Sequence, residues 1–388
     1  MKLETLALLL CGGNGRRMGG RQKSKLKTGG TSFAQRIGTE LLKVADRLLL
    51  SCREAGQAPQ FAGLPCELLF DRTPGIGPIG GLFTALDSMK GGLLITAPCD
   101  MPGLKADLYT YLTRKLTATE STASPEAVPV AAIPTYGEKC YPLSALYRKT
   151  ALPYIKSSIE KGDYGIQYAL KDAPVLYVDV SSLHGAGRML FNINTEEDYR
   201  EFRALEKIVA VCGLKNTGKT TLLRDLIKEL SKRGINTAVV KHDAHGFDCD
   251  IPSTDSYILQ RAGAGGTAVF SKDHYFINNY DEFLQDKARE KQVLFLAGHF
   301  DKADLIFVEG MKDSTFPKIE ILRSGLSQKS VSNPEGLFLI VTDIPEYLEN
   351  SHCTVGGRQI PVLSYRDKEQ ILEALSRQMG SQLLETPS

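Results

Sequence analysis

Eight residues in the second half of the chain, Gly213-Leu-Lys-Asn-Thr-Gly-Lys-Thr220, have the spacing G-x-x-x-x-G-K-[ST]. An apolar run ends just before them, and a helical pattern begins at the lysine. Glycines at these positions let backbone N–H groups curl around phosphates, while the lysine neutralises charge and the threonine hydroxyl can ligate Mg²⁺. The pattern predicts a nucleotide phosphate loop. The residues expected to bind phosphate or metal are Gly213, Asn216, Thr217, Gly218, Lys219, Thr220 and Thr221.

An acid-ended apolar run, Asp304-Leu-Ile-Phe-Val-Glu309, follows later in the chain. If its strand neighbours the one before the phosphate loop, Glu309 lies where it can help to hold Mg²⁺. His242 and His245 follow another expected strand, and we favour a structural or substrate-facing role for them over a metal pair. Three further acids are candidates to organise Mg²⁺ or water, namely Asp243, Asp250 and Asp255. The residues contain no [NT]-K-x-D guanine-reading signature, so ATP and GTP both stay open here.

A second glycine-rich loop, Leu10-Cys-Gly-Gly-Asn-Gly-Arg-Arg-Met-Gly19, opens the chain. It is not a dinucleotide fingerprint, because Met18 stands where the third glycine would be. The loop and its continuation are strongly basic, with Arg16, Arg17, Arg21, Lys23, Lys25 and Lys27. The cluster has no interleaved aromatic residues and follows a buried strand, which favours a triphosphate over nucleic acid. An export signal is disfavoured, because the apolar run Leu6–Leu10 is shorter than the ~7–15 residues required.

Two carboxylates complete this first candidate site. Asp71 follows the apolar run Cys66–Phe70, and Asp100 follows the run Gly92–Ala97 within Ala-Pro-Cys-Asp-Met-Pro102. An acid placed just past a buried parallel strand can hold Mg²⁺ on a triphosphate, although a cap or turn role is the plainer alternative for either one.

Composition limits the remaining possibilities. The chain has 388 residues and a net charge of +2, so any charge-driven binding must be local. Eight cysteines stand far apart with no C-x-x-C pair, which favours buried, reduced thiols in a cytosolic protein. No stretch reaches the ~18 consecutive apolar residues of a membrane span. We expect a protein of the cytoplasm without membrane or nucleic-acid partners.

Strands and helices alternate in two blocks, and the near-continuous apolar strands are typical of sheets covered on both faces. We therefore predict an α/β protein with two three-layer domains, at 1–203 and at 207–388, of which the second carries the P-loop. Expected strands of the first block are Thr5–Leu10, Arg47–Ser51, Cys66–Phe70, Gly92–Ala97, Val128–Ile133, Leu143–Tyr147 and Val175–Val178. Its expected helices include Phe33–Val44, Ile79–Met89 and Ala106–Leu116. In the second block we expect strands Ile208–Cys212, Thr237–Lys241, Leu305–Val308 and Leu337–Val341 and a helix Lys219–Arg233.

The ordered motifs resemble two known families. Residues 1 to about 203 resemble molybdenum cofactor guanylyltransferase (MobA), through L-C-G-G-x-G-R-R-M-G-G with Lys23, D-x-x-P-G-I-G-P-I-G-G-L from Asp71, P-C-D-M-P around Asp100 and F-N-I-N-T from Phe191. Residues from about 207 onward resemble its adaptor partner (MobB). There the similarity rests on G-x-x-x-T-G-K-T-T, K-H-D-x-H-G-F-D-x-D-x-P-x-x-D-S-Y, R-A-G-A and D-L-I-F-V-E-G-M-K. Gln22 departs from the family pattern, which usually has Asp before the loop lysine.

The resemblance implies a Rossmann-like nucleotidyltransferase domain at 1–203 followed by a P-loop NTPase domain at 207–388. It also implies a reaction and roles for individual residues. GTP and Mo-molybdopterin would be the substrates, and Mg²⁺ the metal. The backbone of Leu10, Cys11, Gly12 and Gly13 would hold the nucleotide, with Arg17 and Lys23 on the phosphates. Asp100 would bind Mg²⁺ and Asp71 would position the nucleoside. Asn192 or Asn194 would contact the pterin phosphate or complete the metal shell.

The second domain would bind GTP and Mg²⁺, hydrolyse GTP slowly, and assist delivery of the cofactor to molybdenum-insertion proteins and apo-molybdoenzymes. Two other readings stay open at this point. One is a sugar-phosphate nucleotidyltransferase fused to a regulatory NTPase. The other is a non-catalytic GTPase that delivers finished cofactor.

Overall fold

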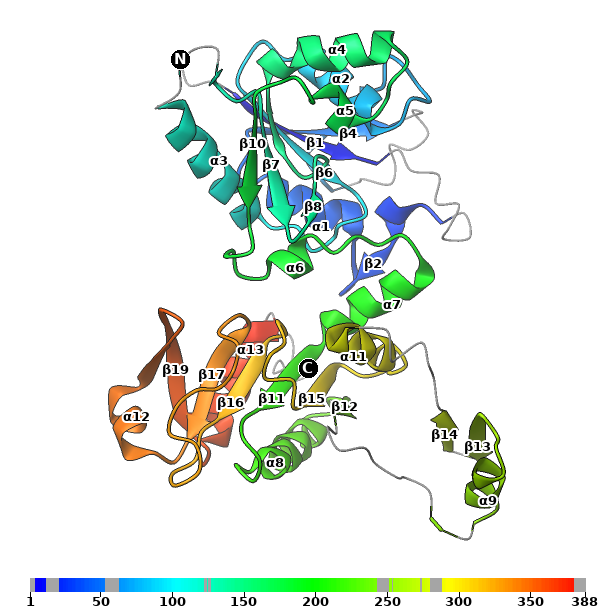
Figure 1. Ribbon diagram of the computed structural model, residues 1–388, viewed down its shortest axis with the longest axis vertical. Coiled ribbons are helices and arrows are strands. Elements are labelled where there is room, and N and C mark those ends of the chain that lie inside the picture. Colours follow the sequence, from blue (N-terminus) through cyan, green and yellow to red (C-terminus); the bar gives the residue numbers. More distant parts are fainter. Residues whose placement is uncertain are drawn as a thin grey trace. The chain divides into compact units, whose positions relative to one another are not determined.

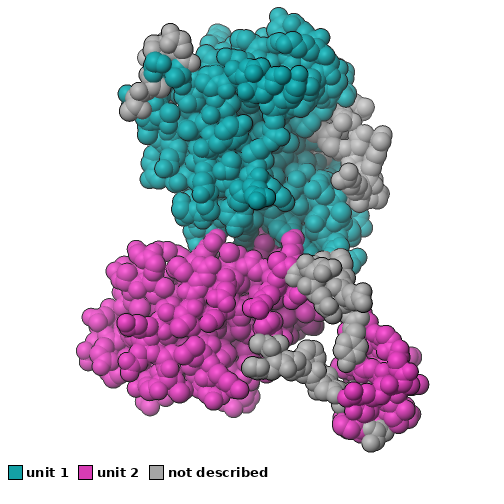
Figure 2. Space-filling view, in the orientation of Figure 1, with its two compact units in different colours: residues 1–202 teal, residues 203–388 magenta. Residues whose placement is uncertain are grey.

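The computed structural model describes residues 4–11, 21–52, 63–121, 124, 127–242, 251–252, 254–272, 274–279 and 288–379. The chain divides into two compact units, Met1–Phe202 and Arg203–Ser388 (Figure 2). Each unit is built on its own large sheet. Within the described residues no helix has the length and apolar content needed to cross a membrane.

The first unit is a mixed sheet with a parallel core. Its strand order is β10-β7-β9-β6-β1-β4-β5, with β8 paired to β7. Strands β6, β1, β4 and β5 run parallel to one another, whereas β9 is antiparallel to both β6 and β7. The strands are β1 (Thr5–Leu10), β2 (Lys27–Thr28), β3 (Thr31–Ser32), β4 (Arg47–Cys52), β5 (Glu67–Phe70), β6 (Leu93–Pro98), β7 (Ala131–Tyr136), β8 (Lys139–Cys140), β9 (Leu146–Arg148) and β10 (Val175–Asp179).

Helices cover both faces of this sheet, as the near-continuous apolar strands require (Figure 1). In β1, Ala7 and Leu9 pack with α1 and α3, while Leu6, Leu8 and Leu10 pack on the other face with α2 and α4. The helical elements are η2 (Lys23–Lys25), α1 (Phe33–Leu41), α2 (Pro78–Ser88), α3 (Ala106–Glu120), η5 (Lys149–Ala151), α4 (Leu152–Glu160), α5 (Ile166–Ala169), α6 (Ala186–Met189) and α7 (Glu196–Leu205).

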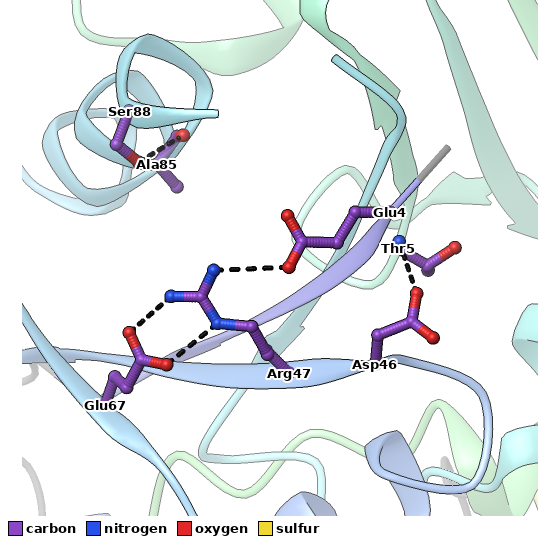
Figure 3. Close-up of polar contacts among 7 residues, drawn as sticks. All are labelled: Glu4, Thr5, Asp46, Arg47, Glu67, Ala85 and Ser88. Atoms are coloured by element: carbon purple, nitrogen blue, oxygen red, sulfur yellow. Dashed lines mark hydrogen bonds and ion pairs between the residues drawn. The ribbon is translucent and has the colours of Figure 1, made fainter. Parts of the chain in front are cut away.

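Ion pairs tie the amino ends of three adjacent strands together (Figure 3). The Arg47 guanidinium of β4 donates to Glu67 of β5, with Nε 2.8 Å from Oε1, and to Glu4 at 3.2 Å. Asp46 accepts the Thr5 amide at 2.8 Å. These charges lie at the end of the sheet opposite to the predicted site. They therefore do not occupy the carboxyl ends of the strands, where that site is expected.

Two expected strands are displaced in the structure. The strand expected at Val128–Ile133 is β7, which begins at Ala131, and the one expected at Leu143–Tyr147 is β9, which begins at Leu146. The cause lies in the preceding turns. Pro129 has no N–H to give a ladder, and the Ser144 amide closes a turn onto the Tyr141 carbonyl at 3.0 Å.

The second unit is a seven-stranded sheet in the order β12-β15-β11-β16-β17-β19-β18. All neighbouring pairs in it are parallel except β18 with β19. Helices α8 and α13 cover one face, through leucines such as Leu226 and Leu375 (Figure 1). The strands are β11 (Ile208–Cys212), β12 (Thr237–Lys241), β15 (Leu305–Glu309), β16 (Lys318–Ile321), β17 (Leu337–Thr342), β18 (His352–Val355) and β19 (Arg358–Ser364). The helices are α8 (Lys219–Lys232), α11 (Arg289–Ala297), α12 (Pro345–Asn350) and α13 (Lys368–Met379).

A small group of elements interrupts this unit, where the sequence predicted none. Helix α9 (Asp255–Arg261) accompanies an antiparallel hairpin of β13 (Gly266–Phe270) and β14 (Tyr275–Asn279). Its large apolar side chains are exposed, namely Ile258, Leu259, Val269, Phe270, Tyr275 and Ile277. Apart from this group, the predicted class of two α/β domains with parallel-rich sheets is confirmed.

Candidate functional site

The first candidate site lies where the strand order of the first sheet reverses. From β1 the chain places β4 on one side and β6 on the other, with Leu10 in register with Ser51 and with Pro98. The Cys99 amide donates to the Leu10 carbonyl at 3.1 Å just beyond the strand ends. A reversal of this kind leaves a crevice outside the carboxyl ends of the strands, which is where α/β sheets bind ligands.

Three predicted residues meet at this crevice. The Lys23 ammonium donates to Asp100 Oδ2 at 3.1 Å and to Asn194 Oδ1 at 2.8 Å. The side chains of Lys23 and Asp100 are 15% and 22% exposed, so the pair is partly shielded but still reachable from solvent. Such a cluster can neutralise phosphate through the ammonium and offer hard oxygen ligands to Mg²⁺.

Asn194 reaches this cluster because the chain around it is held at several points. The Ile193 amide donates to the Asp100 carbonyl at 2.8 Å. The Ile193 side chain is fully buried against a small core of Leu26, Phe33 and Phe202. The amides of Asn194 and of the residue after it both donate to Asp198 Oδ2 at 2.8 Å, a cap at the start of α7.

Asp71 occupies a different part of the same sheet edge, after β5. Its Oδ1 accepts the Ser51 hydroxyl at 2.8 Å. Ser51 is buried at the end of β4, and α2 passes so close that a Cβ at Gly81 would lie 2.6 Å from Ser51 Oγ. The orientation of the Asp71 carboxylate is therefore fixed by a packed neighbour, which suits a role in positioning.

The other residues predicted for this site do not join the cluster of Lys23, Asp100 and Asn194, or lie outside the described residues. Gly12, Gly13 and Arg17 lie outside the described residues. Asn192 is exposed. The Cys11 amide, which was expected to bind the nucleotide, donates to the Ser51 carbonyl at 3.3 Å just beyond the end of β1.

The Cys11 thiol is no candidate nucleophile. It is buried beside Cys99, and the hydrogen bond between the two thiols, together with burial, raises the pKa of Cys11 well above its usual value. A thiol that stays neutral packs as a small apolar group, and it places no negative charge near a bound phosphate.

In the second unit the phosphate loop lies between β11 and α8, as predicted. Gly213 has a φ of 138° and a Cβ there would lie 2.6 Å from the Ile321 carbonyl oxygen. Gly218 has a φ of 95° and begins α8 as its N-cap. Asn216 also has a positive φ, of 64°. These conformations turn the backbone into the cradle that the motif requires.

The side chains of the loop divide into those that shape it and those that face a ligand. Thr217, expected among the ligands, is fully buried, and its hydroxyl donates to the Leu214 carbonyl at 2.9 Å. Only its backbone amide is left for phosphate. The Lys219 ammonium lies on the loop itself, 2.7 Å from the Leu214 carbonyl. Burial lowers its pKa and the nearby Glu309 opposes that change. Thr221 is exposed at the start of α8.

Glu309 stands where the sequence placed it. Strand β15 pairs with β11, with Val211 in register with Glu309. The Thr220 hydroxyl donates to Glu309 Oε1 at 2.9 Å. The Thr220 hydroxyl and the Glu309 carboxylate, next to the lysine expected to bind phosphate, form a set of oxygen ligands that fits Mg²⁺ on a nucleotide.

The remaining acids and histidines contribute less. His242 is bonded through its amide to the Glu309 carbonyl at 3.3 Å. His245, Asp243 and Asp250 lie outside the described residues, and Asp255 opens α9. Among the described residues no three His, Cys, Asp or Glu side chains are grouped to hold a metal ion by themselves.

Sequence reasoning missed three residues beside the phosphate loop, Arg323, Asp343 and Tyr365. Asp343 and Tyr365 directly follow β17 and β19, and Arg323 stands two residues after the end of β16. The rule that found Asp71 and Asp100, an acid just past a buried strand, also applies to Asp343 after Leu337–Thr342.

Comparison with known proteins decides the family. Residues 7–175 match the model of the MobA-like NTP transferase domain, and residues 208–343 match that of molybdopterin guanine dinucleotide synthesis protein B (MobB). The molybdopterin-guanine dinucleotide biosynthesis adapter protein of Escherichia coli K12 is 36% identical over 152 residues, which are 37% of this chain and 81% of that protein. The chain belongs to the MobB family and carries a MobA-like NTP transferase domain ahead of it.

The MobA-like domain has relatives of its own. The molybdenum cofactor guanylyltransferase of Vibrio cholerae is 28% identical over 204 residues, covering 52% of this chain and 93% of that protein. The chain is also similar to the solved structure of molybdopterin-guanine dinucleotide biosynthesis protein A from Archaeoglobus fulgidus, with 24% identity and a TM-score of 0.43. The match covers 51% of this chain and 96% of the chain in that structure. The resemblance seen in the motifs is confirmed for both halves, and the MobA-like half is a nucleotidyltransferase domain.

Proposed function

We propose that the MobA-like domain transfers GMP from GTP to the terminal phosphate of Mo-molybdopterin, forming molybdopterin guanine dinucleotide and releasing pyrophosphate. The observation that carries this proposal is the meeting of Lys23, Asp100 and Asn194 at the switch point of a MobA-like sheet. The names of the relatives supply the substrates, and the chemistry of the cluster fits them.

The reaction needs no protein nucleophile. A phosphate oxygen of the pterin attacks the α-phosphorus of GTP, the bond from that phosphorus to the bridging oxygen breaks, and pyrophosphate leaves with the electron pair. The protein must align two polyanions and neutralise the charge that moves onto the leaving group. Lys23 supplies this charge, with Arg17 as a second cation. Asp71, held by Ser51, positions the nucleoside.

Mg²⁺ would be held by Asp100, with Asn194 completing its shell, and when bound it acts as a Lewis acid on phosphate oxygens. The two side chains fit this role, because a carboxylate and an amide oxygen already converge on one cation, the Lys23 ammonium. Asn192 remains a candidate for the pterin phosphate.

We propose that the transferase domain spans residues 1–203 and that the MobB domain spans residues 207–388. The MobB domain binds GTP and Mg²⁺ through Gly213–Thr221 and Glu309. Its hydrolysis of GTP is slow, because the sequence offers no arginine finger or positioned glutamine that we can name. We propose that it assists delivery of the product to molybdenum-insertion proteins and apo-molybdoenzymes, in the cytoplasm.

The test is pyrophosphate release by the whole chain with Mg²⁺, GTP and Mo-molybdopterin. ATP and CTP replace GTP in parallel reactions, and a sugar 1-phosphate replaces the pterin. Release that requires both GTP and the pterin is the expected result. Release with the sugar phosphate instead would establish the alternative transferase. If only inorganic phosphate appears, the MobB domain is the active half and the transferase proposal is wrong.

A further inference from the structure

Strand order places different chemistry on the two sides of the phosphate loop of the second unit. On one side of β11 lies β15, which ends in Glu309 beside the Thr220 hydroxyl. On the other side lie β16, β17 and β19, in that order. A nucleotide whose phosphates are held after β11 and whose metal faces Glu309 must extend its other end over these three strands, since ligands follow the carboxyl edge of a parallel sheet.

At that place three side chains are already assembled, one from the end of each strand. The Arg323 guanidinium donates to Asp343 Oδ2 at 3.0 Å and stacks on the Tyr365 ring, 4.6 Å from its centroid. The other nitrogen of the same guanidinium, Nη2, lies 3.1 Å from where a Cβ of Gly218 would be. A single guanidinium thus spans the distance between the phosphate loop and the Asp343 carboxylate.

The Asp343 carboxylate is fixed and charged. Its Oδ1 accepts the Ser324 amide at 2.8 Å. Burial opposes ionisation, but this bond and the one from Arg323 outweigh it and lower the pKa of Asp343. The backbone amide of Asp343 also hydrogen-bonds to this carboxylate, and an ionised carboxylate offers about four acceptor positions. The Arg323 and Asp343 side chains are 28% and 30% exposed, so a ligand can reach them.

We propose that Asp343, Arg323 and Tyr365 form the nucleobase subsite of the P-loop, and that Asp343 selects guanine. This inference rests on the proposed binding of nucleotide by the MobB domain and names what that domain reads. Guanine presents two adjacent donors, N1–H and the 2-amino group, to an acceptor such as a carboxylate. Adenine would place its N1 lone pair against the same charge. The planar faces of Arg323 and Tyr365 offer a surface on which the base can stack.

A plain structural ion pair is the competing explanation, and the two make different predictions. A surface ion pair contributes little to stability and is indifferent to the nucleobase. A site built to accept hydrogen bonds from a ligand instead rejects analogues that lack the donors. Base analogues therefore separate the two explanations without any change in the protein.

The first measurement is the affinity of the wild-type chain for GDP, IDP, XDP and ADP by calorimetry with Mg²⁺. Binding that disappears in Lys219→Ala is assigned to the P-loop. We expect GDP to bind about ten- to a hundredfold more tightly than IDP, which lacks the 2-amino group, the range for one hydrogen bond to a charged group. Equal affinity for all four would overturn the inference.

The second measurement uses Asp343→Asn, whose amide oxygen can still accept from Arg323 or Ser324. Its NH₂ group can donate to the 2-oxo group of xanthine, so we expect a fall of about ten- to a hundredfold for GDP and a gain for XDP. The matched control is Glu346→Gln, an exposed acid three residues further on, which should leave both affinities unchanged. An equal loss for GDP and XDP would overturn the proposal.

The two levels of proposal fail in different ways. If no nucleotide binds in a Lys219-dependent manner, the proposed function of the MobB domain is wrong. If nucleotides bind there without regard to the base, only the assignment of Asp343 is wrong. Lys219-dependent binding of XDP by Asp343→Asn shows that the second unit of the variant is folded.

Discussion

Lys23→Met is the substitution that best separates catalysis from structure in the first domain. Methionine keeps the length of the side chain and removes its charge and its donors. In the structure the ammonium bridges Asp100 and Asn194, at 3.1 and 2.8 Å, and the Lys23 side chain is 15% exposed. The substitution leaves one carboxylate and one amide oxygen without this donor, in a place that water can still reach.

The two consequences differ in size. Loss of two partly exposed hydrogen bonds, one of them charge-assisted, should lower the free energy of unfolding by about 1–2 kcal/mol. The interaction of an ammonium with a phosphate charge at ~4 Å is about 4 kcal/mol at an effective dielectric constant of ~20. Every ~1.4 kcal/mol of transition-state stabilisation is tenfold in rate. We therefore expect kcat/KM for pyrophosphate release to fall about 10²- to 10³-fold in a protein that remains folded.

The assay is Mg²⁺-dependent pyrophosphate release with GTP and Mo-molybdopterin. The urea unfolding transition of the variant, compared with that of the wild-type chain, reports whether the first unit is folded. Lys25→Met is the matched control, because Lys25 is exposed and lies in the same short helical turn. A Lys23→Met protein that is folded and retains more than about a fifth of wild-type kcat/KM would refute the electrostatic role.

Three further outcomes are expected. Burial alone would raise the pKa of the Glu40 carboxyl, but hydrogen bonds from two lysines and a backbone amide lower it. Glu40→Gln should therefore reduce the free energy of unfolding by about 1 kcal/mol at neutral pH. In urea titrations this difference should be present above about pH 4.3, the usual pKa of Glu, and should be lost as the pH falls through the lowered pKa of the folded protein. Gly213→Ala should weaken P-loop nucleotide binding at least about tenfold, because its Cβ meets the Ile321 carbonyl at 2.6 Å; unchanged calorimetry would contradict this. Ser51→Ala removes the hydroxyl that donates to Asp71 and should raise KM for GTP several-fold with little change in kcat; an unchanged KM would count against the positioning role.

Local sequence patterns predicted most of the helices and strands. They also predicted two parts of the candidate sites, the phosphate loop and the acids that follow strands. Apolar runs located the central strands, because a strand covered on both faces by helices has few polar positions. Strand β16 was missed for the opposite reason. Its Lys318 and Glu320 are charged, yet both are fully buried. The Lys318 ammonium donates to the carbonyls of Lys312, Ser314 and Asn333, and Glu320 accepts from the Ser330 hydroxyl and the Val331 amide.

The sequence by itself determined the features whose chemistry is contained in a few consecutive residues. The phosphate loop is of this kind, because its glycines, lysine and threonine act on one ligand through one turn of backbone. Acids that follow strands, such as Asp71 and Asp100, are also local features, since the end of a parallel strand is a defined place.

Only the tertiary structure decided which of these local features share a site. Lys23 and Asn194 are 171 residues apart and meet because β1 and β6 are neighbours and the Ile193 side chain is buried in a small core. In the same way, β16, β17 and β19 bring Arg323, Asp343 and Tyr365 together. The order of strands in a sheet results from packing and crossover connections across the whole domain, and no short stretch of residues contains that information.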